Sequence, residues 1–76
     1  MIGELDSVVL TRDFKEHGLE RGDVGTVVHC YPDGKAFEVE FVTGEGDTAA
    51  LLTLNETDIR PIGKHEILHA REITVA

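Results

Sequence analysis

Residues 65–69 contain the sharpest chemical pattern in the chain, the sequence His65-Glu66-Ile67-Leu68-His69. It matches the His-Glu-x-x-His motif that binds zinc in metalloproteases. On a helix, two histidines four residues apart lie one turn apart on one face and can bind a single Zn²⁺, while the glutamate activates a water molecule. The motif therefore raises a metal-dependent hydrolase as one hypothesis for the function.

Three features of the sequence oppose that hypothesis. A short chain with four histidines and many glutamates produces the motif readily by chance. Only Glu72 follows it as a further candidate ligand. A single small domain also lacks the second wall that a peptide-binding groove needs. We therefore expect no catalytic residue, no cofactor and no resident metal, with adventitious binding of zinc or nickel by His65 and His69 as a weaker alternative.

The other residues with reactive side chains carry weaker signals. His29 and Cys30 are neighbours in an apolar run, so in a strand they point to opposite faces and cannot bind the same metal ion. Cys30 is the single cysteine, which excludes an internal disulfide and favours a small buried apolar side chain. His17 follows Glu16 in a charged stretch, where a solvated ion pair is the simplest interpretation.

Length and charge limit the classes of partner. The chain has 76 residues, which is enough for one small domain, and a formal net charge of −8. That charge repels phosphate groups, so we expect no nucleic acid partner. No apolar run reaches the ~18 residues of a membrane span, and Glu4 and Asp6 lie where a secretory signal has basic residues. We expect no membrane association and a cytoplasmic location.

The order of apolar runs and turn residues predicts an all-β fold. The segment 36–42 alternates apolar and acidic residues, so Phe37, Val39 and Phe41 should face the core while Glu38 and Glu40 face solvent. Tight turns flank it, and a long loop at 12–21 should be fixed to the core by its apolar residues. A short helical turn is expected at 55–58. The predicted strands are 6–11, 25–31, 36–42, 48–54 and 59–62.

Several short motifs along the chain occur in a recognisable order. They are Leu5-Asp6, Asp13, Gly18-Leu19, Gly22-Asp23-Val24-Gly25, Val39-Glu40-Phe41 and Arg60-Pro61. With these motifs the chain resembles a bacterial family of small SH3-like barrel proteins known as a domain of unknown function. The resemblance implies a five-stranded SH3-like barrel and extends into residues 66–71. It implies no catalytic residue, cofactor or substrate.

The chain should divide into an SH3-like barrel at 1–62 and a C-terminal extension at 63–76. The apolar residues of the extension fit neither strand nor helical spacing cleanly, and we favour an extended segment that packs on the barrel or on a neighbouring subunit over a short helix. Apolar residues so late in a small chain indicate a surface that is meant to be buried. The predicted interaction face comprises Glu38, Glu40, Phe14, Ile67, Leu68, Ile73 and Val75.

These observations predict a non-enzymatic protein-interaction module, an accessory or antitoxin-like bacterial protein that forms a homo-oligomer. Its partner should be another protein with a basic or neutral surface, because the chain is strongly acidic. Two alternatives stay open. One is the metal-dependent hydrolase that uses His65, Glu66 and His69. The other is a small-molecule binder at a subunit interface, which would need an enclosed apolar pocket.

Overall fold

The computed structural model describes residues 2–74, which form five strands and one short 3-10 helix. No helix in this part of the chain has the length and apolar character needed to cross a membrane. The predicted strand positions are confirmed to within one or two residues at each end. The elements are β1 (Ser7–Leu10), η1 (Lys15–His17), β2 (Val24–Cys30), β3 (Ala36–Val42), β4 (Thr48–Asn55) and β5 (Ile59–Pro61).

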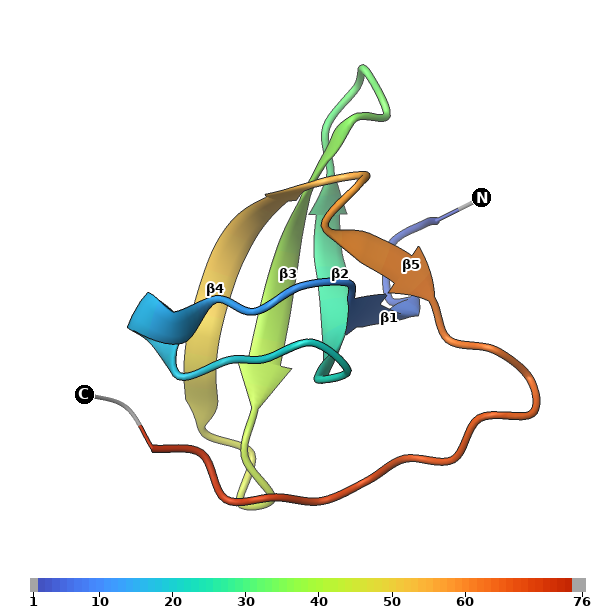
Figure 1. Cartoon of the computed structure of the whole chain (residues 1–76). Coiled ribbons are helices and arrows are strands. Elements are labelled where there is room, and N and C mark those ends of the chain that lie inside the picture. The colour runs from blue at the N-terminus through green and yellow to red at the C-terminus, as the bar shows by residue number, and fades with distance from the viewer. Residues whose placement is uncertain (1, 75–76) are drawn as a thin grey trace.

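The five strands form one antiparallel sheet in the order β4-β3-β2-β1-β5. Figure 1 shows that the sheet curves strongly, so that β4 and β5 lie at its two edges and the long loop after β1 passes in front of it. The sheet therefore has the barrel-like, all-β architecture that the sequence predicts, with short turns joining β2 to β3 and β3 to β4.

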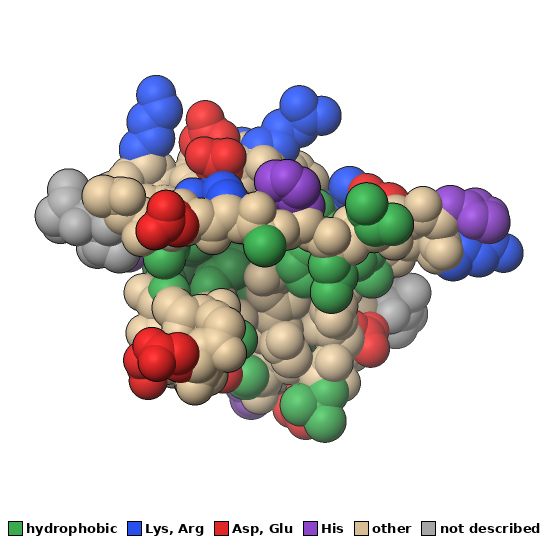
Figure 2. Space-filling model, turned by 90° about the horizontal axis from the view of Figure 1, so that it is seen from below, with side chains coloured by type: hydrophobic (Ala, Val, Ile, Leu, Met, Phe, Trp, Pro, Cys, Tyr) green, Lys and Arg blue, Asp and Glu red, His purple; other side chains and the backbone are tan. Residues whose placement is uncertain are grey.

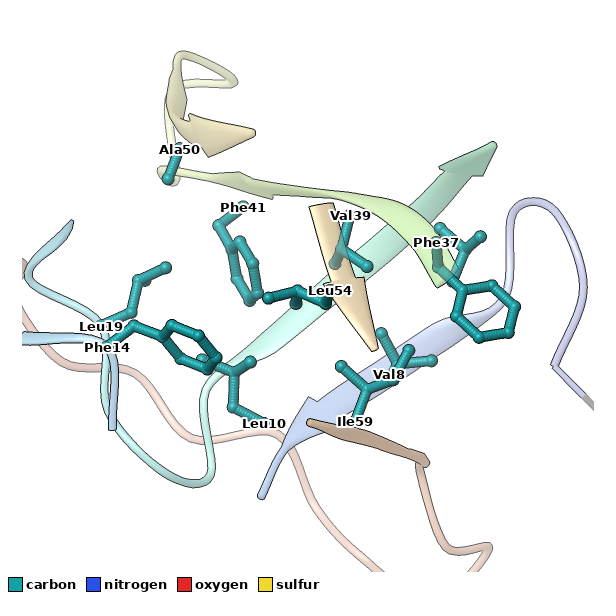
Figure 3. Packing of buried hydrophobic residues seen from close by; sticks show 11 residues of the cluster. Val8, Leu10, Phe14, Leu19, Phe37, Val39, Phe41, Ala50, Leu54 and Ile59 are labelled. Atoms are coloured by element: carbon teal, nitrogen blue, oxygen red, sulfur yellow. The ribbon is translucent and has the colours of Figure 1, made fainter. Parts of the chain in front are cut away.

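The core lies on the concave side of this sheet. In β3 the alternation places Phe37, Val39 and Phe41 inside, as predicted. Figure 3 shows these side chains converging with others from β1, β4, β5 and the long loop. Most of them are branched aliphatic residues, which fill a small interior without polar atoms. The cluster consists of Val8, Leu10, Phe14, Leu19, Val27, Phe37, Val39, Phe41, Ala50, Leu54 and Ile59.

Two features of β2 adapt it to this packing. A Cβ atom at Gly25 would lie 2.7 Å from Val39 Cγ1 and 2.8 Å from a ring carbon of Phe41, so only glycine fits there. The register between β2 and β3 shifts between Val27 and His29, as in a β-bulge. Past the bulge His29 is exposed and Cys30 is partly buried against the core, so the two side chains do not share a site.

The long loop between β1 and β2 is fixed by its apolar residues, as predicted. Phe14 and Leu19 are both buried in the core, and their backbones form an isolated antiparallel bridge. The three-residue helix η1 lies between them, a local element that the sequence interpretation as a plain loop had missed. Gly18 ends this helix with φ 70°, a left-handed conformation that glycine adopts without steric cost.

A hydrogen-bonded turn at residues 56–58 joins β4 to β5 at the place where a short helical turn was predicted, and it depends on Asp58. The Asp58 carboxylate accepts hydrogen bonds from Asn55 N (3.0 Å) and Arg12 Nε (3.0 Å), and Asp58 N donates to Asn55 O. Asp58 is 8% exposed. The Asp58 carboxylate is therefore a structural group that holds the turn.

Beyond β5, residues 66–74 form neither helix nor strand. We call residues 63–74 the tail. Figure 1 shows the tail leaving β5, passing below the sheet past the turn between β3 and β4, and ending on the side of η1. The tail thus crosses the open lower end of the sheet in an extended path.

Candidate functional site

The histidine motif lies in the tail, outside any helix. Residues 64 and 65 form a turn and residues 66–69 have no regular structure, so His65 and His69 are not placed one helical turn apart. Within residues 2–74 no group of three or more His, Cys, Asp or Glu side chains is arranged to hold a metal ion. The geometry that the zinc motif requires is therefore not present in this conformation.

The Glu66 carboxylate has a different role, as the first anchor of the tail. Arg60 Nη1 and Nη2 each donate to one of its oxygens at 2.7 Å, and Gly63 N donates at 2.5 Å. The hydrogen bonds from Arg60, followed by the bond from the Gly63 backbone, lower the pKa of Glu66 to about 2. A general base that activates water needs a pKa nearer to neutrality. Glu66 is therefore a poor match for the role that the zinc motif assigns to it.

Arg71 forms the second anchor, at the far end of the tail. Its Nε donates to Asp23 Oδ1 at 2.9 Å, its Nη2 donates to Asp23 Oδ2, and Nη2 also donates to Gly18 O at 3.0 Å. Glu20 Oε1 lies 3.7 Å from Arg71 Nε. Partial burial acts to raise the pKa of Asp23, but the hydrogen bonds from Arg71 and the Glu20 backbone outweigh it and the pKa is lowered. Arg71 thus ties the tail to both ends of the Gly18–Asp23 segment.

The end of the described tail packs directly on the long loop. Ile73 is partly buried against the core cluster. A Cβ atom at Gly18 would lie 2.6 Å from Thr74 O and 3.4 Å from Ile73 Cγ1, so the absence of a side chain at Gly18 lets the tail approach. Apolar packing and the Arg71 anchor therefore act at the same place.

Between its anchors the tail exposes two large apolar side chains. Ile67 is 88% exposed and Leu68 is 71% exposed. In Figure 2, which views the molecule from the side that the tail crosses, hydrophobic side chains gather across the middle of the face and charged side chains lie toward its margins. Ile67 and Leu68 are thus presented to solvent by a segment that is held at both ends.

The predicted acidic residues of β3 are half-buried and already have partners. The Glu38 carboxylate accepts hydrogen bonds from Tyr31 Oη at 2.7 Å and from Thr53 Oγ1, and Glu40 accepts one from Thr48 Oγ1 at 2.6 Å. The hydrogen bonds from Thr53 and Tyr31 lower the pKa of Glu38. These two carboxylates therefore hydrogen-bond neighbouring side chains on the sheet surface, in addition to giving that surface negative charge.

The remaining residues of the predicted interaction face have different fates. Phe14 is 7% exposed and belongs to the core, so its assignment to an interaction face was wrong. Ile73 is already packed against the barrel. Val75 lies outside the described residues. Of the predicted set, Ile67 and Leu68 are the apolar residues that the structure leaves fully available.

Two open hollows lie near β1 and β5. The larger, of about 650 Å³, is lined by polar and charged residues together with Leu10, and the smaller, of about 240 Å³, lies beside the N-terminal segment. Neither is an enclosed apolar chamber of the kind that a small-molecule binder typically uses. The linings are Leu10, Thr11, Asp13, Arg21, Gly22 and Arg60 for the first, and Ile2, Asp6, Ser7, Val8, Pro61 and Ile62 for the second.

The two anchors of the tail were missed by sequence reasoning. Arg71 and Asp23 are 48 residues apart, and no periodicity links them. The nearer pair, Arg60 and Glu66, is six residues apart, and the interpretation of Glu66 as part of a zinc motif obscured it. The available signal was the placement of Asp23 directly after Gly22, at the end of the turn that leads into β2, where a fixed carboxylate can meet a distant arginine.

Comparison with known proteins identifies the family without adding a function. A family model described as a domain of unknown function, DUF4926, matches residues 4–61. No curated protein and no solved structure matches the chain. The matched segment contains all five strands and the long loop and stops before the tail. On this match the chain belongs to the DUF4926 family, a domain of unknown function.

Proposed function

We propose that this protein is a non-enzymatic protein-interaction module, an SH3-like barrel that uses its tail as a contact segment. The observation that carries the proposal is the exposure of Ile67 and Leu68, at 88% and 71%, on a segment anchored at both ends. Large apolar side chains held in fixed positions favour binding, because less conformational freedom is lost when a partner covers them.

The chemistry of the molecule indicates the kind of partner. The two exposed apolar residues favour a partner with an apolar patch, while the net charge of −8 favours a basic or neutral surface around it. Lys64 and His65 lie next to this segment, so a partner with a strongly basic patch at that point would be repelled. We therefore propose a protein partner whose contact surface has an apolar centre. Basic residues should surround that centre, except at the side that faces Lys64 of this chain.

The sheet topology supports the SH3-like assignment. The strand order, the long loop between β1 and β2, and the single turn between β4 and β5 are compatible with the five-stranded SH3-like barrel that the resemblance implies. Small barrels of this kind serve as docking modules elsewhere, an analogy of fold that adds modest weight. An accessory or antitoxin-like role in a bacterial cytoplasm is the setting that we propose for it.

The two alternative functions receive less support. For the hydrolase, the Glu66 carboxylate is bound by Arg60 and its pKa is about 2. For the small-molecule binder, the hollow of about 650 Å³ is open and lined by Asp13, Arg21 and Arg60. A surface contact made by the tail therefore accounts for more of the structure.

The test compares capture of partners by three forms of the immobilised protein from an extract of its source cells. The test variant is Ile67→Ser with Leu68→Ser. The control is Val24→Thr with Val28→Thr, which changes two exposed apolar residues on β2. We expect a protein that is retained by the wild type and the control but reduced about tenfold with the tail variant. Equal retention by all three forms, or retention of nothing, would contradict the proposal.

A further inference from the structure

The edge of the sheet formed by β4 has backbone groups without partners in the described chain. Ala36 O accepts a hydrogen bond from Tyr31 N, and Glu56 N donates to Lys35 O. In an antiparallel sheet, the backbone groups of successive residues point alternately to the two neighbouring strands. Ala36 O points toward β2, so the backbone groups of Phe37 and Val39 point toward β4. Their register partners Leu54 and Leu52 therefore direct their own backbone groups toward β3. The N–H and C=O groups of Leu51 and Thr53 therefore point away from β3, and within residues 2–74 no backbone or side-chain group bonds them.

The free part of this edge is short and has defined ends. At one end, Asn55 N and O are both bonded to Asp58. At the other end, the register shift between Phe41 and Val42 places an extra residue in β4 next to Ala50, as in a β-bulge, and Asp47 O accepts from Thr43 N. The regular free edge is therefore Leu51 to Thr53, with Leu52 at its centre.

This edge also lacks the features that protect sheet edges from pairing. β4 is eight residues long and contains no charged residue and no proline. At the opposite edge, β5 has three residues, which include Arg60 and Pro61. Charged residues, proline and short length are the usual means of blocking edge pairing, and β5 has all three. The β5 edge is therefore protected from pairing, and the β4 edge is not.

The pattern of free groups is complementary to itself. If a second β4 lies antiparallel across a two-fold axis at Leu52, Leu51 faces Thr53 of the second copy and Thr53 faces its Leu51. Each pair exchanges two hydrogen bonds, so four bonds satisfy all the free groups of both edges. Leu52, which is half-buried against the core, meets its own copy and extends the apolar interior across the junction.

The charges in this register do not oppose one another. Asp47 faces Thr57 of the second copy and Glu56 faces Thr48, so no carboxylate lies opposite a carboxylate. Glu40 is beside Leu51 and Glu38 is beside Thr53 in the sheet. In the joined sheet, Glu40 and Glu38 of the second copy are three strand spacings apart, about 14 Å. That distance exceeds the Debye length of about 8 Å at physiological salt.

We propose that two copies of this chain form a two-fold dimer by antiparallel pairing of β4 with β4, centred on Leu52. This surface is separate from Ile67 and Leu68, so the dimer goes beyond the tail contact proposed above and each can fail without the other. The dimer would leave both tails free to bind a partner.

The first experiment measures molar mass by light scattering over chain concentrations up to about 1 mM. We expect a mass that rises toward twice the 8.3 kDa of the single chain. Leu51→Pro removes an edge N–H that has no partner within residues 2–74, and proline is tolerated at such edge positions. It should weaken the dimer by about 30-fold or more through the loss of two of the four hydrogen bonds. Leu51→Ser keeps the N–H and should still dimerise.

The second experiment tests the register by cross-linking. In a Cys30→Ser background, Leu52→Cys places two thiols on the two-fold axis, at a Cα separation of about 4.5 Å that allows a disulfide. We expect rapid oxidation to a covalent dimer. Leu51→Cys in the same background is the control, because its two copies are diagonal neighbours about 7–8 Å apart and should link much more slowly.

Three results would overturn the proposal. The first is a wild type that stays monomeric at about 1 mM. The second is a dimer that persists in Leu51→Pro when circular dichroism shows that the variant is folded. The third is faster cross-linking at position 51 than at position 52. The Ile67→Ser and Leu68→Ser variant separates the two proposals, because it should leave this dimer unchanged. Loss of the dimer in that variant would assign self-association to the tail and would also overturn the β4 pairing.

Discussion

The barrel and the tail are held in place by different physical forces. In the barrel, Val8, Val27 and Val39 are completely buried, and the backbone is joined by a continuous antiparallel ladder. The tail has no regular hydrogen-bonded structure from residue 66 onward and depends on two arginine–carboxylate pairs and on Ile73. Burial of apolar groups involves no titrating group and is not subject to Debye screening, whereas exposed ion pairs weaken when a partner is neutralised or when the ionic strength rises.

The difference has a consequence for function. Removing a buried leucine side chain costs 2–5 kcal/mol, whereas an exposed ion pair contributes about 0–1 kcal/mol. We therefore expect the tail to detach from the barrel at a lower free-energy cost than unfolding of the barrel. A segment of that kind is suited to making and releasing contacts on a stable support.

The largest contrast is between the same substitution in the two regions. Leu10 is 1% exposed and Leu68 is 71% exposed. Leu10→Ala should lower the free energy of unfolding by about 3 kcal/mol, because it leaves a cavity in the core. Leu68→Ala should change it by less than about 0.5 kcal/mol. Urea unfolding measures both, and similar losses for the two variants would show that the tail is part of the cooperative fold.

Asp58 should be the most important charged residue of the barrel. Asp58→Ala removes the buried carboxylate of this turn, which accepts hydrogen bonds from Asn55 N and Arg12 Nε. We expect a loss of about 2 kcal/mol in the free energy of unfolding. Glu56→Ala, in the same turn but exposed, is the control and should cost less than about 0.5 kcal/mol. A small effect of Asp58→Ala would contradict the structural role assigned to it.

The contact between barrel and tail at Gly18 can be tested with Gly34 as the control. The two glycines have φ values of 70° and 71°, but only at Gly18 would a Cβ atom meet the tail, 2.6 Å from Thr74 O. Both Gly→Ala variants should cost about 1 kcal/mol in stability from backbone strain. Only Gly18→Ala should also increase hydrogen exchange in residues 71–74. Equal exchange in the two variants would show that the tail does not need this close approach.

Arg71 should hold the tail without contributing much to the barrel. Arg71→Gln should lower the free energy of unfolding by about 1 kcal/mol or less, because the pair is partly exposed. Cleavage by chymotrypsin near Leu68 should nevertheless become faster. Arg21→Gln removes the same charge from an exposed arginine that forms no ion pair within residues 2–74, and it should leave the cleavage rate unchanged. Equal cleavage rates would rule out Arg71 as an anchor.

Acid should release the tail with only a small effect on the barrel. The pKa values of Asp23 and Glu66 are lowered in the folded protein, that of Glu66 to about 2. The anchors therefore contribute fully above the ordinary carboxylate pKa of about 4 and are lost as the pH falls below it. Hydrogen exchange in the tail should be constant from pH 7 to about pH 5 after correction for intrinsic rates.

The contribution of Glu66 should decline progressively below about pH 4 and be lost as the pH falls through about 2, its pKa in the folded protein. Glu66→Gln removes the titrating group, so the acid dependence at the Gly63 end of the tail should disappear in that variant. An unchanged acid dependence there would assign the release to another carboxylate.

The strands could be predicted from the sequence because their pattern is local. The alternation of residues 36–42 identified β3 with its observed limits, and turn residues separated the other strands. Phe14 shows where such reasoning ends, because it was predicted both to fix the loop to the core and to lie at an interaction face, and only the first proved correct. An apolar residue in a loop has no periodicity from which its exposure can be inferred.

The candidate site was predictable only in part. Ile67 and Leu68 are exposed, and their assignment to an interaction face stays a prediction. The roles of Asp58, Glu66 and Arg71 were not visible, because charged side chains look alike in a sequence until their partners are known. The bulge and the capped ends of β4 likewise arise from pairing with β3 and from Asp58.

The amino-acid order alone determined that this chain is a small acidic all-β domain, because strand formation follows side-chain alternation and turn residues that act over a few positions. Tertiary contacts between residues that are tens of positions apart decided three further features. These are which carboxylates are structural, where the tail is anchored, and which strand edge stays unpaired. Ion pairs and edge exposure depend on distances in space, and a single sequence carries no record of those distances.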